Sequence, residues 1–216
     1  YSDRAFTVQD KAIRFGLGGI KNVGDAAIDD LIRERQIHGT YSSILDFCKR
    51  VNYRVVNKRL LESLIRCGAM DSFPENRNQL IQVYENAQAI GAKSQKDQAM
   101  GTMSLFGDME EAVDQLAIPQ TADFPEEDKL RDEKDYTGFY ITGHPLDSYQ
   151  KEMEGLFEIG KLLENPEKFD GQSIVVGGLI ANAVTRLTKR NDAMANIRLE
   201  DFTGSVDVVV FPKAYA

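Results

Sequence analysis

The sequence predicts a multidomain α plus β protein, with helices in its N-terminal part and strands in its C-terminal part. Between residues 10 and 92, apolar residues recur at the three- and four-residue spacing of helices. From residue 173 onward their period changes to two, which is typical of strands. A polar and acidic stretch without either period separates these regions. The four expected parts are residues 1–92, 93–125, 126–170 and 171–216.

The composition excludes several classes of protein. Hydrophobic residues make up 42% of the chain and charged residues 28%, as in ordinary soluble proteins. No apolar run is long enough to cross a membrane and no signal peptide is recognisable, so we expect a cytoplasmic protein without a membrane partner. Two cysteines, Cys48 and Cys67, are too few for a disulfide framework and are expected to be reduced. Both termini are abrupt, and we expect an excised segment of a longer chain.

The net charge of −8 is unevenly distributed. Residues 1–92 carry 13 Lys and Arg against 11 Asp and Glu, a balance of +2. Residues 93–172 carry 8 against 19, a balance of −11, and residues 173–216 carry 5 against 4, a balance of +1. Because the acidity is confined to the middle, both ends remain available to polyanions such as nucleic acids.

The segment Ile20–Gly24 has the pattern of a helix-hairpin-helix turn. Such a turn needs residues that accept a left-handed or tight backbone, and Asn22 and Gly24 are expected to supply them. Val23 between them anchors the turn in the core. The following helix then presents its first backbone amides, which lack partners within the helix, as a phosphate site that reads no base sequence. Lys21 adds a positive charge beside this site.

A second unit of the same kind is expected further along the N-terminal part. A helix at 57–66 is followed by a compact turn at 68–73 that begins with Gly68, and then by a helix from residue 76. Two such units in tandem form an all-α domain that grips duplex DNA, with Lys58 and Arg59 as additional phosphate contacts. Each turn alone is also typical of an ordinary helix connection, and each cation of a solvated helix face.

Residues 93–125 are expected to form a flexible acidic linker, and residues 126–170 a helical connector. The linker contains one apolar insert, Met103–Phe106, which could also dock on the protein's own helices. His144 has no companion with metal-ligand spacing, so we expect it to shape a turn. No cluster of residues has the pattern of a catalytic or metal site.

Three strands can be drawn between residues 171 and 216, beginning near Ser173, Met194 and Val206. An OB-fold barrel has five, so this part is predicted to be the N-terminal portion of an OB fold. OB domains hold single strands with the loop between the first two strands and the outer sheet face. The candidate single-strand contacts are Arg186, Lys189, Arg190 and Arg198. A basic loop that only improves solubility is the alternative.

Several blocks of sequence together resemble the α subunit of bacterial DNA polymerase III. They occur in the family's order and span nearly the whole chain. The blocks are Ile13–Gly24, Asp46–Val51, Asn57–Asp71, Gly138–Asp147, and Leu199–Gly204 with Val208–Pro212.

This resemblance implies the region that follows the polymerase fingers, namely a tandem helix-hairpin-helix domain, a clamp-binding linker and an OB domain. It implies duplex DNA, single-stranded DNA, the sliding clamp and other replisome subunits as partners. The family's catalytic carboxylates lie further N-terminal, so we expect no catalytic residue, metal site or cofactor here, although the parent polymerase implies Mg. The implied clamp-binding peptide is Thr102, Met103, Ser104, Leu105 and Phe106, with Thr102 where the family's peptide typically begins with Gln.

Three alternatives remain at this point. The chain could be a scaffold of the replisome with little DNA affinity of its own. It could belong to an error-prone paralogue of the polymerase. It could also be an OB protein like those of aminoacyl-tRNA synthetases, although the tandem hairpins argue against this.

Overall fold

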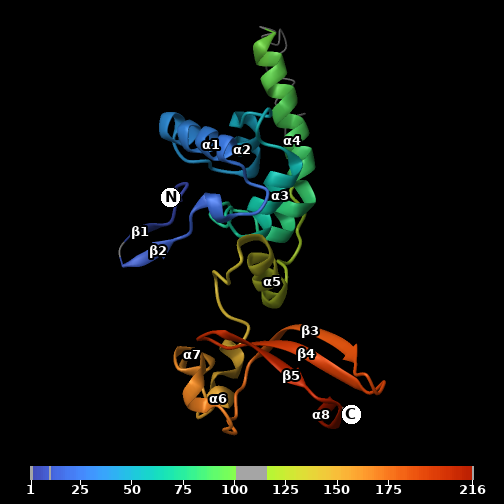
Figure 1. The fold of residues 1–216 in the computed structure, drawn as a ribbon. Coiled ribbons are helices and arrows are strands. Elements are labelled where there is room, and N and C mark those ends of the chain that lie inside the picture. Colours follow the sequence, from blue (N-terminus) through green and yellow to red (C-terminus); the bar gives the residue numbers. More distant parts are fainter. Residues whose placement is uncertain (1, 10, 101–115, 216) are drawn as a thin grey trace. The chain divides into compact units, whose positions relative to one another are not determined.

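The computed structural model describes residues 2–9, 11–100 and 116–215. The chain divides into two compact units, Tyr1–Ile141 and Thr142–Ala216. The first is mainly helical and the second is built on a three-stranded antiparallel sheet (Figure 1). This confirms the predicted fold class, a helical part followed by a partial β domain. No helix in the described ranges is long and apolar enough to span a membrane.

The elements of the first unit are mostly those expected from the helical period. They are β1 (Thr7–Gln9), β2 (Ala12–Arg14), the 3-10 helix η1 (Leu17–Gly19), α1 (Asp25–His38), α2 (Ile44–Arg50), α3 (Lys58–Arg66), α4 (Arg77–Ala99) and α5 (Glu126–Thr137). Side chains at the N-cap position fix where three helices begin. Ser43, Asn57 and Asn76 each accept a hydrogen bond from the backbone amide three residues later.

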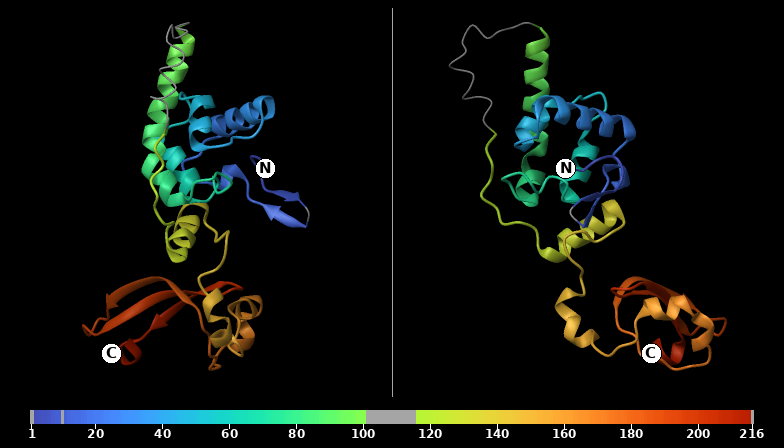
Figure 2. Two further views of the ribbon diagram at one scale, coloured as in Figure 1. Left: turned by 180° about the vertical axis from the view of Figure 1, so that it is seen from behind. Right: turned by 90° about the vertical axis from the view of Figure 1, so that its left-hand side faces the viewer.

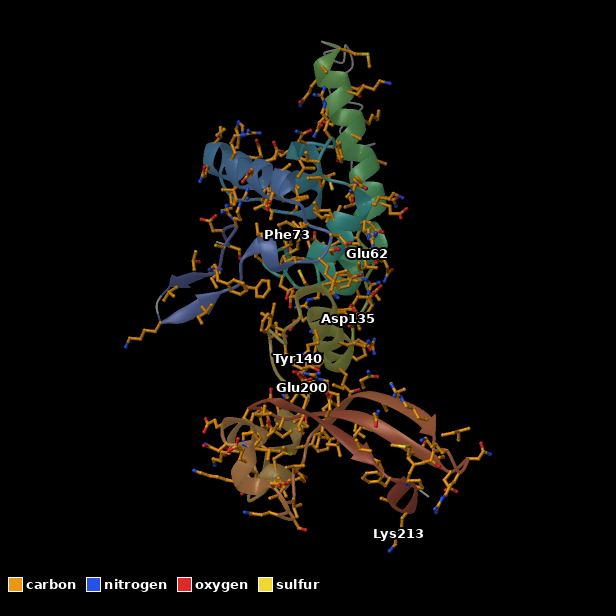
Figure 3. The ribbon with its side chains drawn as sticks, in the orientation of Figure 1. Glu62, Phe73, Asp135, Tyr140, Glu200 and Lys213 are labelled. Carbon is orange, nitrogen blue, oxygen red and sulfur yellow. The ribbon has the colours of Figure 1, made fainter. Side chains whose placement is uncertain are left out.

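One hydrophobic core holds these helices together. Helix α2 lies along α4, and α3 contacts both α4 and α5. Arg66 on α3 pairs with Glu62 and Asp132 at 2.9 Å each. Figure 3 labels Glu62 on α3 and Asp135 on α5. Both cysteines are buried and free, and burial raises the pKa of the Cys67 thiol to about 11. The fully buried side chains include Ile28, Ile44, Leu61, Ile65 and Leu80.

Two boundaries differ from those predicted. Residues 12–14 do not continue a helix but pair with β1, where Val8 lies opposite Ile13. Helix α4 continues to Ala99, so residues 93–99 are helical and not linker. Their Lys, Gln and Ala are good helix formers, but they carry no apolar period by which a helix could be recognised. The predicted clamp peptide, residues 102–106, lies outside the described residues.

The end of the predicted linker is attached to the first unit. Leu116 and Ile118 pack against the core. Side-chain amides from the first turn of α4 then donate to main-chain carbonyl oxygens of this segment, which leads into α5 (Figure 2). The pairs are Gln79 with Pro119 at 2.7 Å, Asn76 with Thr121 at 2.9 Å and Asn78 with Ala122 at 2.7 Å. We call residues 116–123 the strap.

A buried cation joins the first residue of α4 to α5. Arg77 is 4% exposed, and its guanidinium donates to Asp71 at 2.6 Å and to Glu133 on α5 at 2.8 Å. Glu133 is fully buried, and its second oxygen accepts from the backbone amide of Ile141 at 2.8 Å. Burial opposes the charge on Arg77, but these hydrogen bonds outweigh it and raise the pKa of the guanidinium above its ordinary value.

Replacing Glu133 by Ala should therefore destabilise the first unit strongly. The change removes one of the two carboxylates that compensate the buried Arg77 guanidinium and leaves a cavity beside it. Removing one partner of a buried ion pair costs up to about 3–5 kcal/mol. Urea denaturation followed by circular dichroism measures the change in the free energy of unfolding. Glu127→Ala, on the exposed first turn of α5, is the control. Equal stability of the two variants would contradict the prediction.

The second unit carries short helices before its sheet. Its elements are η2 (Asp147–Tyr149), α6 (Gln150–Met153), α7 (Ile159–Glu164), η3 (Pro166–Phe169), β3 (Leu179–Leu187), β4 (Ala193–Glu200), β5 (Ser205–Val210) and α8 (Pro212–Tyr215). The strands pair in the order β3-β4-β5. Three strands were predicted, but the first begins at Leu179 and not at Ser173, because the segment before it pairs with no strand.

The turn between β4 and β5 is held by Asp201, which is 6% exposed. One carboxylate oxygen accepts from the amide of Ile159 at 2.7 Å, and the other accepts from the backbone amides of Thr203 and Gly204 at 2.7 and 2.9 Å. Burial opposes the carboxylate charge, but these donors outweigh it and keep the pKa of Asp201 below its ordinary value. Asp201 thus ties the sheet to the start of α7.

Candidate nucleic-acid interface

The predicted hairpin turn lies between η1 and α1. Asn22 has the left-handed backbone that its residue type predicts, with φ of 66°. Ile20 and Val23 are buried, and the amide of Val23 donates to the carbonyl of Ile20 at 3.3 Å. Val23 therefore anchors the turn in the core, as expected, and only its backbone is near the surface.

Gly24 has a different role from the predicted one. Its φ is −83° and its ψ 155°, so it is extended, and the expectation of a left-handed or tight backbone here is wrong. It is the N-cap residue of α1, and a Cβ atom added to it would meet nothing within 4 Å. The protein's own packing leaves open space at this position. A backbone of another molecule could approach it closely.

The first turn of α1 offers unused hydrogen-bond donors. Among the described residues, none accepts from the backbone amides of Gly24, Asp25 and Ala26, whereas the next two amides bind the carbonyl of Gly24. Such amides, at the positive end of the helix dipole, favour an anion. The Asp25 carboxylate opposes an anion here, but it is paired with Arg4 at 3.3 Å.

Lys21, three residues before Gly24, has an exposed side chain. Its own backbone amide is not available, because it donates to the carbonyl of Tyr136 on α5 at 2.8 Å. Asn22 also turns its side chain inward, toward α3, where it donates to the hydroxyl of Ser63 at 3.0 Å. Of the predicted hairpin residues, Lys21 offers its side chain and Gly24 its backbone.

The second predicted hairpin differs from the first. Gly68 ends α3 with φ of 78°, and the amides of Gly68 and Ala69 donate to the carbonyls of Ile65 and Leu64 at 3.0 and 2.9 Å. This pattern is a Schellman motif, which closes the C-terminus of a helix. A Cβ on Gly68 would lie 2.1 Å from the Arg77 guanidinium. Gly68 is therefore explained by its backbone and by the buried cation.

The strap covers the helix start of this second hairpin. The amide of Asn78 donates to the Asp123 carboxylate at 3.3 Å, and the amide of Gln79 donates to the Asn76 side chain at 2.9 Å. Lys129 pairs with the same Asp123 at 3.0 Å. Two amides at the N-terminus of α4 are thus occupied, and the two hairpins are not equivalent.

The two cations predicted at the start of α3 are both exposed. Lys58 pairs with Glu85 on α4 at 2.8 Å, and this contact raises the pKa of its ammonium group. The side chain of Arg59 has no partner among the described residues. Its main-chain carbonyl accepts from the hydroxyl of Ser63 at 2.8 Å. Arg59 is therefore the more available of the two cations.

Two of the predicted cations, Arg186 and Arg198, share one face of the sheet with Asp207, which lies 3.8 Å from Arg198. Cross-strand partners share a face, and the register pairs Arg186 with Met194 and Asn182 with Arg198. The opposite face carries Ile197, Leu199 and other apolar residues. Arg198 donates to Ser205 at 2.7 Å, while Arg186 is exposed and has no partner in the described part of the chain.

The predicted basic loop joins β3 to β4. Asn191 is left-handed, with φ of 66°, and donates its amide to the carbonyl of Thr188 at 2.9 Å. Lys189 and Arg190 at the tip of this loop are exposed. The loop therefore presents two further cations at the end of the strands that carry Arg186 and Arg198.

His144 serves a turn, as predicted. Its Nδ1 accepts from the amide of Leu146 at 3.2 Å, and its ring lies 4.8 Å from that of Phe202. Within the described ranges, no group of three or more His, Cys, Asp or Glu residues could hold a metal ion. Phe211, after β5, is 66% exposed, because the described strands do not enclose it.

Sequence reasoning missed the residues that hold these surfaces in place. Ser63, Tyr136 and the strap contacts lie far along the chain from the turns they bind. The start of α4 agrees with the helix predicted from residue 76, where Asn76 and Gln79 form a capping box, but no local signal indicates that Asn78 binds the strap.

Comparison with known proteins agrees with this organisation. A family model described as a helix-hairpin-helix motif matches residues 1–80. The chain is 39% identical to the DNA polymerase III subunit alpha of Borreliella burgdorferi, over 99% of this chain and 19% of that protein. It is 34% identical to that of Deinococcus radiodurans and 31% to that of Vibrio cholerae, over 99% and 97% of this chain and 17% and 18% of those proteins. The chain thus spans less than a fifth of the length of these relatives.

The two predicted hairpin glycines should respond differently to alanine. Gly68→Ala places a Cβ on a left-handed backbone and against the Arg77 guanidinium, so we expect a loss of about 2 kcal/mol or more. Gly24→Ala meets open space with an extended backbone, so we expect a loss below about 1 kcal/mol, from the weaker cap alone. Thermal denaturation of both variants measures the difference. A larger loss for Gly24→Ala would contradict it.

Proposed function

Because the chain belongs to the family of DNA polymerase III α subunits, we propose that it is a DNA-holding segment of a DNA-directed DNA polymerase. In this proposal the segment contains none of the polymerase's catalytic residues. It contributes affinity for DNA and for the sliding clamp while the nucleotidyl transfer takes place elsewhere in the enzyme. The bound duplex would be held without regard to its base sequence, as replication requires.

The first hairpin carries this proposal. Three backbone amides at the start of α1 are open, Gly24 leaves room for close approach, and Lys21 supplies a cation next to them. A DNA phosphate fits this combination, because it is an anion with several acceptor oxygens. Arg59, one turn before Ser63 on α3, would add a second charge contact. Lys58 contributes less because Glu85 competes for it.

The sheet of the second unit supports a single-strand contact. Arg186 and Arg198 share one face of the sheet, and Arg186 is the freer of the two because Asp207 lies 3.8 Å from Arg198. Lys189 and Arg190 lie in the loop that joins these two strands. Such an arrangement follows the OB-fold pattern of single-strand binding, in which charge tracks the phosphates and rings stack on bases. Two exposed rings are available to a base. Phe211, 66% exposed, directly follows β5, whose last residue pairs with Ala195 near the loop, whereas Phe202, 45% exposed, lies in the β4–β5 turn at the other end of β4.

A clamp-binding role rests on residues 102–106. Leu105 and Phe106 are the apolar anchors of a peptide that would enter a pocket on the sliding clamp. Thr102 stands where such peptides typically have Gln, which predicts reduced affinity for the clamp. Other replisome subunits are further partners in this proposal.

A replisome scaffold is the second candidate, and one observation favours it. The strap and the Asn76 cap occupy amides at the start of α4, which removes part of the second phosphate site. A chain with one open hairpin would bind duplex more weakly than a chain with two. If the chain belongs to an error-prone paralogue of the polymerase, the first hairpin and the sheet would hold DNA in the same way.

Binding of a duplex oligonucleotide at several salt concentrations tests the DNA-holding role. We expect the logarithm of the binding constant to fall linearly with the logarithm of the salt concentration. The slope should correspond to a few phosphate contacts. Gly24→Val should abolish most of this binding without unfolding the chain, because its side chain fills the space needed by the phosphate. Lys21→Ala should reduce the slope by about one.

Lys93→Ala provides the charge-matched control, since Lys93 is an exposed cation on α4 away from the hairpin. It should leave the slope unchanged. Absence of salt-dependent binding by the unaltered chain would exclude the DNA-holding role and favour the scaffold.

The clamp contact has its own test. The double change Leu105→Ala and Phe106→Ala should abolish binding to the purified sliding clamp, because both anchors of the peptide are lost. Restoring the expected polar start with Thr102→Gln should tighten binding. Surface plasmon resonance measures both effects. Unchanged clamp affinity in the double variant would show that another segment binds the clamp.

A further inference from the structure

We propose that Ser63 is a positioning residue for the first hairpin, which sets how tightly the α1 amides hold a DNA phosphate. This inference rests on the proposed function of the hairpin. Ser63 lies on α3, far from the turn in sequence, and its side chain would touch no DNA, because it is fully buried.

The hydroxyl of Ser63 links two segments of the interface. It accepts from the side-chain amide of Asn22 at 3.0 Å and donates to the carbonyl of Arg59 at 2.8 Å. Its donor and one acceptor position are therefore both used. Through this one oxygen, the left-handed residue of the turn is attached to the helix that carries the exposed Arg59.

Helix formation alone does not explain a serine at this position. Alanine is the better helix former, and a buried hydroxyl must be hydrogen-bonded to avoid a desolvation cost. The bond to the Arg59 carbonyl satisfies the hydroxyl hydrogen but gives the helix nothing that alanine would lack. The contact that only serine can make is the one with Asn22.

The contact with Asn22 acts where the turn is least stable. A non-glycine residue at φ of 66° can relax to the commoner negative region, which would rotate the peptide groups that follow it. Those groups include the amides of Gly24 and Asp25, which must converge on one phosphate. Fixing the Asn22 side chain therefore holds the amides in a binding arrangement before DNA arrives, and less ordering remains to be done on binding.

A double-mutant cycle on DNA binding tests this role. Asn22→Gly keeps a backbone that accepts positive φ but removes the side chain, and Ser63→Ala removes its partner. We expect each single variant of the 216-residue chain to bind duplex about three- to tenfold more weakly. In the Asn22→Gly background, Ser63→Ala should change the affinity less than about twofold, because the contact is already lost.

Val83→Ala separates positioning from a general loss of stability. Val83 is buried in α4, away from the turn, and its truncation destabilises the same core. At a temperature where every variant is folded, Val83→Ala should bind duplex like the unaltered chain.

The outcomes are distinct. If Ser63→Ala weakens binding equally with and without Asn22, or does not weaken it, Ser63 has no positioning role. If Val83→Ala weakens binding as much as Ser63→Ala, the effect is one of stability and the inference falls. If the unaltered chain shows no salt-dependent duplex binding, the proposed function itself fails.

Discussion

A guanidinium can be buried only if other groups compensate its charge, and three segments of the first unit meet around Arg77 to do so. Asp71 comes from the turn after α3, Glu133 from the middle of α5, and Arg77 itself opens α4. The same cation requires a glycine at position 68, because any side chain there would enter its space. The end of one helix, the start of the next and the docking of a third therefore depend on a single charged group.

This constraint extends to the first hairpin through α5. The helix held by Glu133 offers the carbonyl of Tyr136 to the amide of Lys21. The strap reaches the same helix from the other direction, because Asp123 binds both Lys129 on α5 and the amide of Asn78 on α4. The hairpin is thus fixed by parts of the chain more than a hundred residues downstream. Its shape is a property of the whole unit and not of the turn alone.

Local physical chemistry accounts for what the sequence predicts correctly. Asn22 was recognised because few other residues accept a left-handed backbone, and the three strands because β-branched residues alternate along them. Gly24 shows the limit of this reasoning: backbone strain requires glycine at one position, whereas at another the fold would admit a side chain and glycine only leaves open space, and the sequence does not distinguish the two cases. Residue 68 belongs to the first kind and residue 24 to the second.

Long-range contacts account for most of what the sequence does not predict. Nothing in the acidic run around Glu133 predicts that this carboxylate is fully buried, since its neighbours Asp132 and Asp135 carry the same charge. The strap likewise looked like flexible linker, because apart from the Asp123 carboxylate it is held through main-chain carbonyls, which every residue possesses. The small β1–β2 hairpin was missed because three-residue strands are too short to display a period.

The unexpected length of α4 limits the working radius of the proposed clamp contact. The helix ends at Ala99, so Leu105 is only a few residues from a rigid support. Whatever path the intervening chain takes, covalent geometry keeps that leucine within about 20 Å of the helix end. A clamp bound there would be connected to the helix by only a few residues. Its distance from the DNA would then be set mainly by the length of α4 and not by the average extension of a random coil.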